Sequence, residues 1–323
     1  MQNQSWSIET VAIDGPEDLR EITRGSDVVV TQLKPGKLQG RIRHIGLGSL
    51  GISVGQFSSE IRSTGPLHRE RVVLGTLLSR VGRASMWWEE TRPGDVGIFP
   101  PGVAADAIYG GGASYAVVSV DPPELSSMLG TEGRVADPAL WNTRRLCQTD
   151  PRIGEEVARR LTGIMSNVVE RKATASLSGD FLRRTIVEAF VMSVLSALPK
   201  DRRQPSTGAR LVSETDNYVD AAGERPVHIS ELCSALKVSR RTLHRAFDDT
   251  LGIGPVTYLR RRRLSAIRSI LKQSDPATIS IGDLAFEYGF PEPGRFAAYY
   301  RDHFGETPSE TLRSRSGRTR SIN

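Results

Sequence analysis

Residues 229–255 read ISELCSALKVSRRTLHRAFDDTLGIGP, and residues 281–308 read IGDLAFEYGFPEPGRFAAYYRDHFGETP. The apolar residues of a short helix and its turn recur 52 residues later. Those of the next helix recur 53 residues later, because the second turn is one residue longer. The matched positions in that second helix are Leu243 with Phe296, Phe247 with Tyr300, Gly252 with Gly305, and Pro255 with Pro308. Such self-similarity indicates a duplicated supersecondary unit.

Each copy has the pattern of a helix-turn-helix, in which a turn of three or four residues joins two short helices. Cys233 and Ala285 supply the small residue that a close approach of the two helices requires. Val238 and Phe290 fill the angle between the helices. A generic helical bundle is the alternative, but it does not explain the repeat. The helix ends are predicted at polar N-caps and at left-handed glycines, namely Ser239, Ser280, Gly252 and Gly305.

The second helix of the first copy separates an apolar face from a face rich in hydrogen-bond donors. Leu243, Ala246 and Phe247 form the apolar face. A helix of this kind buries one face and places the other in the major groove of DNA, where donors reach bases and phosphates. For any single arginine, an ordinary surface charge is the alternative. The predicted DNA contacts of this helix are Ser239, Arg240, Arg241, Thr242, His244 and Arg245.

The positive charge of the chain is concentrated in one segment. The 323 residues carry a net charge of +6, yet residues 237–272 hold ten basic and two acidic side chains, or +8. The rest of the chain is therefore at −2. A basic stripe on a near-neutral protein indicates a phosphate partner, although a solvated helix face gives the same composition. Four consecutive arginines, Arg260 to Arg263, span a full helical turn, so not all of them can face phosphate.

The last 100 or so residues resemble the signature of the AraC/XylS family of bacterial transcription regulators. The residues that carry the resemblance are Val238-Ser239, Thr242-Leu243, Phe247, Gly252, Tyr258-Leu259, Arg263-Leu264, Gly289-Phe290, Arg295-Phe296, Tyr300-Arg301, Phe304-Gly305 and Thr307-Pro308-Ser309. The resemblance implies two helix-turn-helix units joined by a long helix, here about residues 255–271. Two successive major grooves, about 34 Å apart, would then be read by one chain. Residues 33–38 and 294–298 are also similar to regulators related to the ethanolamine-operon activator.

The resemblance also implies base-reading positions in each unit. In the first unit they are Arg241, His244 and Arg245. In the second unit the predicted DNA contacts are Gly294, Arg295, Ala297 and Arg301. Residues 273–310 carry two basic and seven acidic side chains, or −5, and Pro293 stands at the start of the second recognition helix. We therefore expect the two units to contribute unequally to DNA binding.

The composition of the N-terminal half predicts a β-rich domain over residues 1–150. Apolar runs alternate with turn residues between about 27 and 120, a pattern typical of sandwiches and barrels. The run from Arg92 to Gly102 resembles the turn-then-strand of cupin-type barrels. The predicted fold class is thus α+β with several domains: a cupin-like barrel with a helical extension, then an all-α domain of two helix-turn-helix units joined by a long helix.

Four further segments complete the predicted organisation. Residues 151–200 have helical periodicity, and their apolar faces either cover the barrel or pair with a second subunit. Residues 201–208 are predicted to be a linker, since residues 199–208 lack apolar side chains and include two prolines. The DNA-binding domain is placed at 209–312 and a basic disordered tail at 313–323.

The N-terminal half lacks the patterns of catalytic and metal sites. His44 and His68 are the only histidines before His228, and no nucleophile-elbow, P-loop or dinucleotide-binding motif is present. The two cysteines, Cys147 and Cys233, are too far apart for a zinc motif and suit a reducing compartment. We therefore expect no enzyme activity, no metal and no cofactor. Aromatic residues in such a domain either pack in its core or line a pocket for an organic effector; the candidates for the pocket are Trp87, Trp88, Phe99 and Tyr109.

The favoured function is a sequence-specific, DNA-binding transcription regulator, an activator, controlled through its N-terminal domain. The expected partners are double-stranded DNA, RNA polymerase, a small organic effector and a second copy of the chain. No apolar run spans a membrane and no signal pattern opens the chain, so we expect a soluble cytoplasmic protein without a membrane partner. A non-specific architectural DNA binder and a barrel enzyme with a DNA-binding autoregulatory tail are the alternatives.

Overall fold

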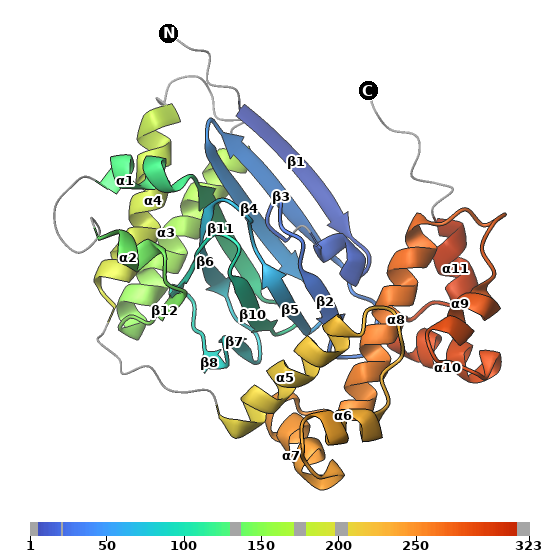
Figure 1. Ribbon diagram of the computed structural model, residues 1–323. Coiled ribbons are helices and arrows are strands. Elements are labelled where there is room, and N and C mark those ends of the chain that lie inside the picture. The colour runs from blue at the N-terminus through green and yellow to red at the C-terminus, as the bar shows by residue number, and fades with distance from the viewer. Residues whose placement is uncertain (1–5, 21, 130–136, 171–178, 198–205, 315–323) are drawn as a thin grey trace. The chain divides into compact units, whose positions relative to one another are not determined.

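The structure, a computed structural model, describes residues 6–20, 22–129, 137–170, 179–197 and 206–314 (Figure 1). The chain forms two compact units. The first runs over Met1–Val30 and Leu38–Asp201, and the second over Thr31–Lys37 and Arg202–Asn323. Most of the predicted linker (201–205) and of the predicted tail (315–323) lies outside the described residues, so the domain boundaries expected from the sequence stay predictions.

The strands form two antiparallel sheets. The seven-stranded sheet has the order β1-β3-β4-β11-β6-β9-β12, and the five-stranded sheet has the order β2-β5-β10-β7-β8. The β-rich N-terminal half is confirmed, with its strands in two sheets rather than one closed barrel. The strands are β1 Trp6–Ile13, β2 Val29–Gln32, β3 Gly40–Leu47, β4 Leu50–Phe57, β5 Ile61–Pro66, β6 Val72–Ser79, β7 Ala84–Met86, β8 Glu89–Glu90, β9 Val96–Phe99, β10 Ala104–Tyr109, β11 Ser114–Val120 and β12 Arg145–Cys147. Strands β1 and β12 lie outside the stretch of about 27–120 that the sequence predicts.

Within the described residues of the first unit, the structure has five helical segments. They are the 3-10 helix η1 Pro16–Leu19 and the α-helices α1 Pro122–Leu129, α2 Pro138–Trp141, α3 Pro151–Glu170 and α4 Gly179–Leu195. Helices α3 and α4 cover one face of the seven-stranded sheet (Figure 1). Helices α3 and α4 thus pack on the β-domain, and pairing of this segment with a second subunit stays a prediction.

Strand β6, an inner strand of the seven-stranded sheet, is buried on both faces because it lies between two cores. Val72 and Leu74 pack toward the helices, against Leu161 and Phe190. Val73 and Leu77 point to the opposite side, into the core that the two sheets share. Successive side chains of a strand alternate between its faces, so a strand covered on both sides is apolar throughout. This is why residues 72–78 read VVLGTLL rather than alternating with polar residues.

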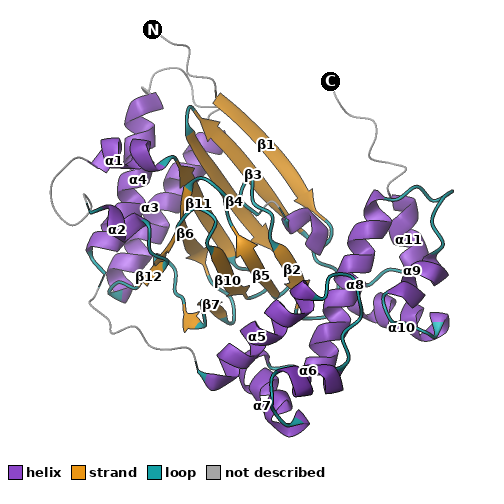
Figure 2. Cartoon of the chain, in the orientation of Figure 1, coloured by secondary structure: helices purple, strands orange, loops and turns teal. Residues whose placement is uncertain are grey.

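The described helices of the second unit follow in chain order after the β-rich half (Figure 2). They are α5 Thr207–Ala221, α6 Ile229–Ala235, α7 Arg240–Leu251, α8 Pro255–Gln273, α9 Ile281–Glu287, α10 Pro293–Phe304 and α11 Pro308–Arg313. The long helix α8 begins with Pro255 at its first turn, where the missing N–H of proline is not needed. It connects the pair α6–α7 with the pair α9–α10, which confirms the predicted architecture. In the part of the chain that the structure describes, no helix has the length and apolar character to cross a membrane.

Candidate nucleic-acid interface

The first helix-turn-helix consists of α6 and α7. Ser239 caps α7, since its hydroxyl accepts a hydrogen bond from the Thr242 amide at 3.0 Å. The turn closes through the Val238 amide, which donates to the Cys233 carbonyl at 3.0 Å. Gly252 ends the helix with φ of 69°, in the left-handed region that favours glycine. The cap, the turn and the helix end all agree with the sequence prediction.

The second helix-turn-helix, α9 with α10, repeats this backbone geometry. The Phe290 amide donates to the Ala285 carbonyl at 2.9 Å, the counterpart of the Val238 bond. Gly305 ends α10 with φ of 73°. Gly289 in the turn has φ of 76°, and the residue at the same place in the first turn, Lys237, has φ of 53°. The left-handed conformation of Lys237 was not predicted from the sequence, although its alignment with Gly289 in the repeat is the signal that indicates it.

The predicted contact residues of α7 share one exposed face. Leu243, Ala246 and Phe247 are buried beneath it. Phe247 packs against Tyr258 of α8, with ring centroids 5.4 Å apart. The exposed residues are Arg240, Arg241, Thr242, His244 and Arg245. Their contact with DNA stays a prediction, and the structure gives the face from which they would make it.

The face of α10 is poorer in available charge. Arg295 is exposed but forms an ion pair with Glu292, with Nη1 and Oε1 3.0 Å apart. The ion pair holds the guanidinium at the start of the helix. The hydrogen bond with Glu292 also raises the pKa of Arg295. Gly294 and Arg301 are exposed, and Ala297 is half-buried. Glu292 precedes the helix without capping it through its side chain. This arrangement agrees with the expectation of a weaker second unit.

The four consecutive arginines of α8 contact other residues of the second unit and do not form an exposed basic stripe. Arg262 pairs with Asp216 at 2.8 Å and with Asp220 at 2.5 Å, both on α5. The guanidinium of Arg263 lies 4.9 Å from the centre of the Phe290 ring and donates to the Tyr288 and Gly289 carbonyls at 3.2 Å. The guanidinium of Arg260 stacks 4.2 Å from the centre of the Tyr299 ring. A further basic residue, Arg268, is fully buried against Glu306. These contacts show that much of the +8 segment stabilises the fold, which the sequence count alone does not reveal.

The buried carboxylate of Asp216 joins α5 to α8. It accepts hydrogen bonds from the Tyr258 hydroxyl and from Arg262, each at 2.8 Å. Asp216 is almost fully buried, and a buried charge requires such partners. Helix α5, whose Ala209, Leu211 and Val212 are buried, is therefore an integral part of the second unit.

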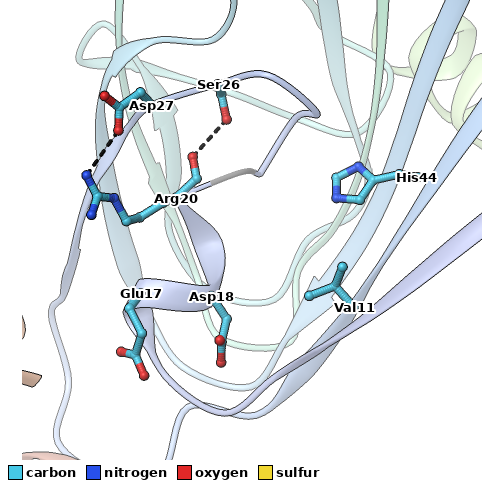
Figure 3. A pocket seen from close by; sticks show the side chains of 7 residues that line it. All are labelled: Val11, Glu17, Asp18, Arg20, Ser26, Asp27 and His44. Atoms are coloured by element: carbon cyan, nitrogen blue, oxygen red, sulfur yellow. Dashed lines mark hydrogen bonds and ion pairs between the residues drawn. The ribbon is translucent and has the colours of Figure 1, made fainter. Parts of the chain in front are cut away.

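The first unit contains a pocket of about 510 Å³, and Figure 3 shows the seven side chains that line it. Arg20 pairs with Asp27 at 3.1 Å, and the Ser26 hydroxyl donates to the Arg20 carbonyl at 2.8 Å. The lining residues are Val11, Glu17, Asp18, Arg20, Ser26, Asp27 and His44. The buried His44 also contacts the Ser53 hydroxyl, with Nδ1 and Oγ 2.8 Å apart. None of the aromatic candidates predicted from the sequence is among these lining residues.

The four aromatic candidates occupy other places. Phe99 and Tyr109 are buried in the core between the two sheets, and burial raises the pKa of Tyr109 to about 12. Trp87 and Trp88 form the turn between β7 and β8, with φ of 47° and 71°. Trp87 packs on Phe99 with ring centroids 4.7 Å apart. The guanidinium of Arg62 lies 4.7 Å from the centre of the Trp88 ring. Their role in ligand binding stays a prediction. The described residues also contain no cluster of three or more side chains suited to hold a metal ion.

Comparison with known proteins places the strongest similarity in the second unit. Residues 232–314 match a helix-turn-helix domain family. The chain is 36% identical over 96 residues to the XylDLEGF operon transcriptional activator of Pseudomonas putida, which covers 30% of each protein. It is 24% identical over 290 residues to XylDLEGF operon transcriptional activator 3 of the same organism, covering 87% of this chain and 84% of that one.

A solved structure of a probable AraC family transcriptional regulator from Rhodopseudomonas palustris CGA009 covers 33% of this chain and 97% of that chain, at 33% identity and a TM-score of 0.30. The sequence matches confirm the resemblance of the C-terminal residues to AraC/XylS-type regulators. The chain spans 30% of the length of the first of these relatives, so most of that protein lies outside the match.

Proposed function

We propose that this protein is a sequence-specific, DNA-binding transcription regulator, and that it acts as an activator. The observation that supports the proposal is the duplicated helix-turn-helix of α6–α7 and α9–α10, with matched turns and with a left-handed glycine at the end of each recognition helix, in a chain related to transcriptional activators. The exposed donors of α7 supply base and phosphate contacts. Two recognition helices on one chain would read two half-sites one helical turn apart, about 10 base pairs.

Selection of bound sites from random DNA tests this proposal. The full chain should enrich one bipartite sequence, with two conserved blocks whose centres lie about 10 base pairs apart. The affinity for the enriched site should exceed that for scrambled DNA by at least about 10³-fold at physiological salt. A specificity ratio near one, with a steep salt dependence, would instead identify a non-specific architectural binder.

We also propose that the first unit forms a homodimer through helix α4. One face of α4 packs on the seven-stranded sheet through Ile186, Phe190 and Val194. The opposite face exposes Phe181, Met192 and Leu195, which are 62%, 48% and 49% accessible to solvent. Residues 181, 192 and 195 fall on one side of a helix because 11 residues make about three turns. Exposed apolar patches of this kind mark association surfaces.

Sedimentation of the full chain tests the dimer. The wild-type protein should sediment as a dimer, and Met192→Lys should shift it toward a monomer. Val81→Lys is the matched control, because Val81 is 59% exposed in a loop outside this face. A monomeric wild type, or the same shift in both variants, would contradict the assignment. RNA polymerase and a small organic effector are the remaining proposed partners, and the pocket of Figure 3 is the place where binding of such an effector should be sought first.

A further inference from the structure

A short segment of the N-terminal half of the sequence belongs to the helix-turn-helix unit. We name Thr31–Lys37, with the sequence TQLKPGK, the strap. Its neighbours in the chain, Val30 and Leu38, belong to the other unit, whereas the strap itself is part of the second unit. Residues 202–323 by themselves therefore lack part of this unit.

The strap binds the C-terminal end of α10. The His303 carbonyl accepts a hydrogen bond from the Gly36 amide at 3.0 Å and from the Gln32 side-chain amide at 3.3 Å. The last four carbonyls of a helix have no partner within the helix, so they need partners from outside. Because His303 is 3% exposed, water has little access to this end of the helix. The strap thus supplies the hydrogen bonds that solvent gives to an exposed helix end.

Gln32 holds the strap in the shape that this contact requires. Its side chain is fully buried, and its Nε2 lies 2.7 Å from both the Lys34 and the Gly36 carbonyl oxygens. Gly36 has φ of 118°, a conformation that residues with a side chain rarely adopt. One buried amide therefore folds the strap and joins it to the end of α10.

Two more contacts attach the strap on either side of this point. Arg261 of α8 donates a hydrogen bond to the Leu33 carbonyl. At the other end, the Cγ atom of Lys37 lies 3.0 Å from the position that a Cβ on Gly305 would occupy. Gly305 is the left-handed residue that ends α10. The strap therefore links the central helix α8 to the terminus of α10.

We propose that Gln32 and Gly36 are positioning residues for DNA recognition and that they act by fixing α10 relative to α8. This inference rests on the proposed function, because α10 is the recognition helix of the second unit. α10 starts at Pro293 without a side-chain cap, so its C-terminal anchorage is more important for its orientation. Helix α7 has its own cap at Ser239 and needs no such support. Loss of the strap contact should therefore impair reading of one half-site and leave the other intact.

The test uses the full chain with Gln32→Leu, which removes the donor at similar volume, and Gly36→Ala, which strains the turn. Gly223→Ala and Gly82→Ala are matched controls, because these glycines also have positive φ, 63° and 73°, and open space around them. Affinity is measured for the selected site and for sites scrambled in either half. The first half-site is the one at which Arg241→Ala relaxes base preference. Amide hydrogen exchange of α7 and α10 is followed in parallel.

The strap variants should lose amide protection at residues 301–305 and bind the intact site about fivefold to tenfold more weakly, the loss expected for one hydrogen bond. The difference in affinity between the strap variants and the wild type should vanish once the second half-site of the DNA is scrambled. Unchanged protection and affinity would overturn the inference. Equal losses at both half-sites would also overturn it, since they would show a general loss of stability. If the wild-type chain prefers no sequence at all, the proposed function itself is wrong.

Discussion

The inequality of the two recognition helices leads to a direct comparison of Arg241→Ala with Arg295→Ala. Arg241 lies on the exposed face of α7, where neighbouring donors are exposed as well. Arg295 must leave its ion pair with Glu292 before it can bind a base or phosphate. The surrounding residues 273–310 carry a net charge of −5, which repels the DNA backbone.

The expected magnitudes follow from these environments. A bidentate arginine–guanine contact is worth about 1–3 kcal/mol, so Arg241→Ala should weaken binding by about 5-fold to 150-fold and relax base choice at one position. Arg295→Ala should weaken binding by less than about threefold, because the contact it can make is offset by the loss of its present ion pair. Removal of that pair by Glu292→Gln should strengthen binding and make the Arg295→Ala loss larger.

Fluorescence anisotropy with the selected DNA, at one fixed salt concentration, measures all of these affinities. Arg210→Ala is the matched control, because Arg210 is 67% exposed and forms a similar ion pair with Glu214 on α5, outside both recognition helices. Its affinity should equal that of the wild type. Equal losses for Arg241→Ala and Arg295→Ala would refute the argument that the ion pair and the local charge weaken the second unit.

Three further predictions concern stability. Phe247→Ala should lower the free energy of unfolding of the second unit by about 3–5 kcal/mol, measured in urea, because it removes a fully buried ring; a loss below about 1 kcal/mol would contradict this packing. Ser239→Ala should cost about 1 kcal/mol through the lost cap of α7, whereas Ser234→Ala, at an exposed position within α6, should cost less. Burial and then the nearby Arg261, Arg260 and Arg268 lower the pKa of His303 from 6.5 to about 3. His303 of the unfolded chain therefore becomes protonated below about pH 6.5, whereas in the folded chain it stays neutral down to about pH 3. The free energy of unfolding should fall by about 2 kcal/mol between pH 8 and pH 5. His303→Leu should remove this part of the pH dependence, and an unchanged pH profile would show that His303 does not titrate in this way.

The helix ends and turns could be predicted from the sequence because each depends on neighbours in the chain. Ser239 caps an amide three residues away, and Gly252 and Gly305 end their helices by adopting a backbone conformation of their own. The capping box of Thr307 with Glu310 is local as well, but it was missed; the pattern of a threonine followed by glutamate three residues later is the signal for it.

The candidate DNA-binding face was predicted for α7 because apolar periodicity alone separates its buried side from its exposed side. The same periodicity could not show where the side chains of α8 find partners. Arg262 meets Asp216 from a helix 46 residues earlier in the chain, and that pairing exists only after α5 has packed on α8. The pocket of the first unit was not predicted from the sequence either, because its lining residues come together only when β1, η1 and β3 have packed.

The duplicated helix-turn-helix and the exposed donors of α7 follow from the amino-acid sequence, because helix period, turn length and capping are properties of short stretches of chain. Packing in three dimensions sets which charges remain on the surface, and it brings Gln32 to the His303 carbonyl across 271 residues. Contacts of that kind depend on which surfaces exclude water together, and no local pattern in the chain records that choice.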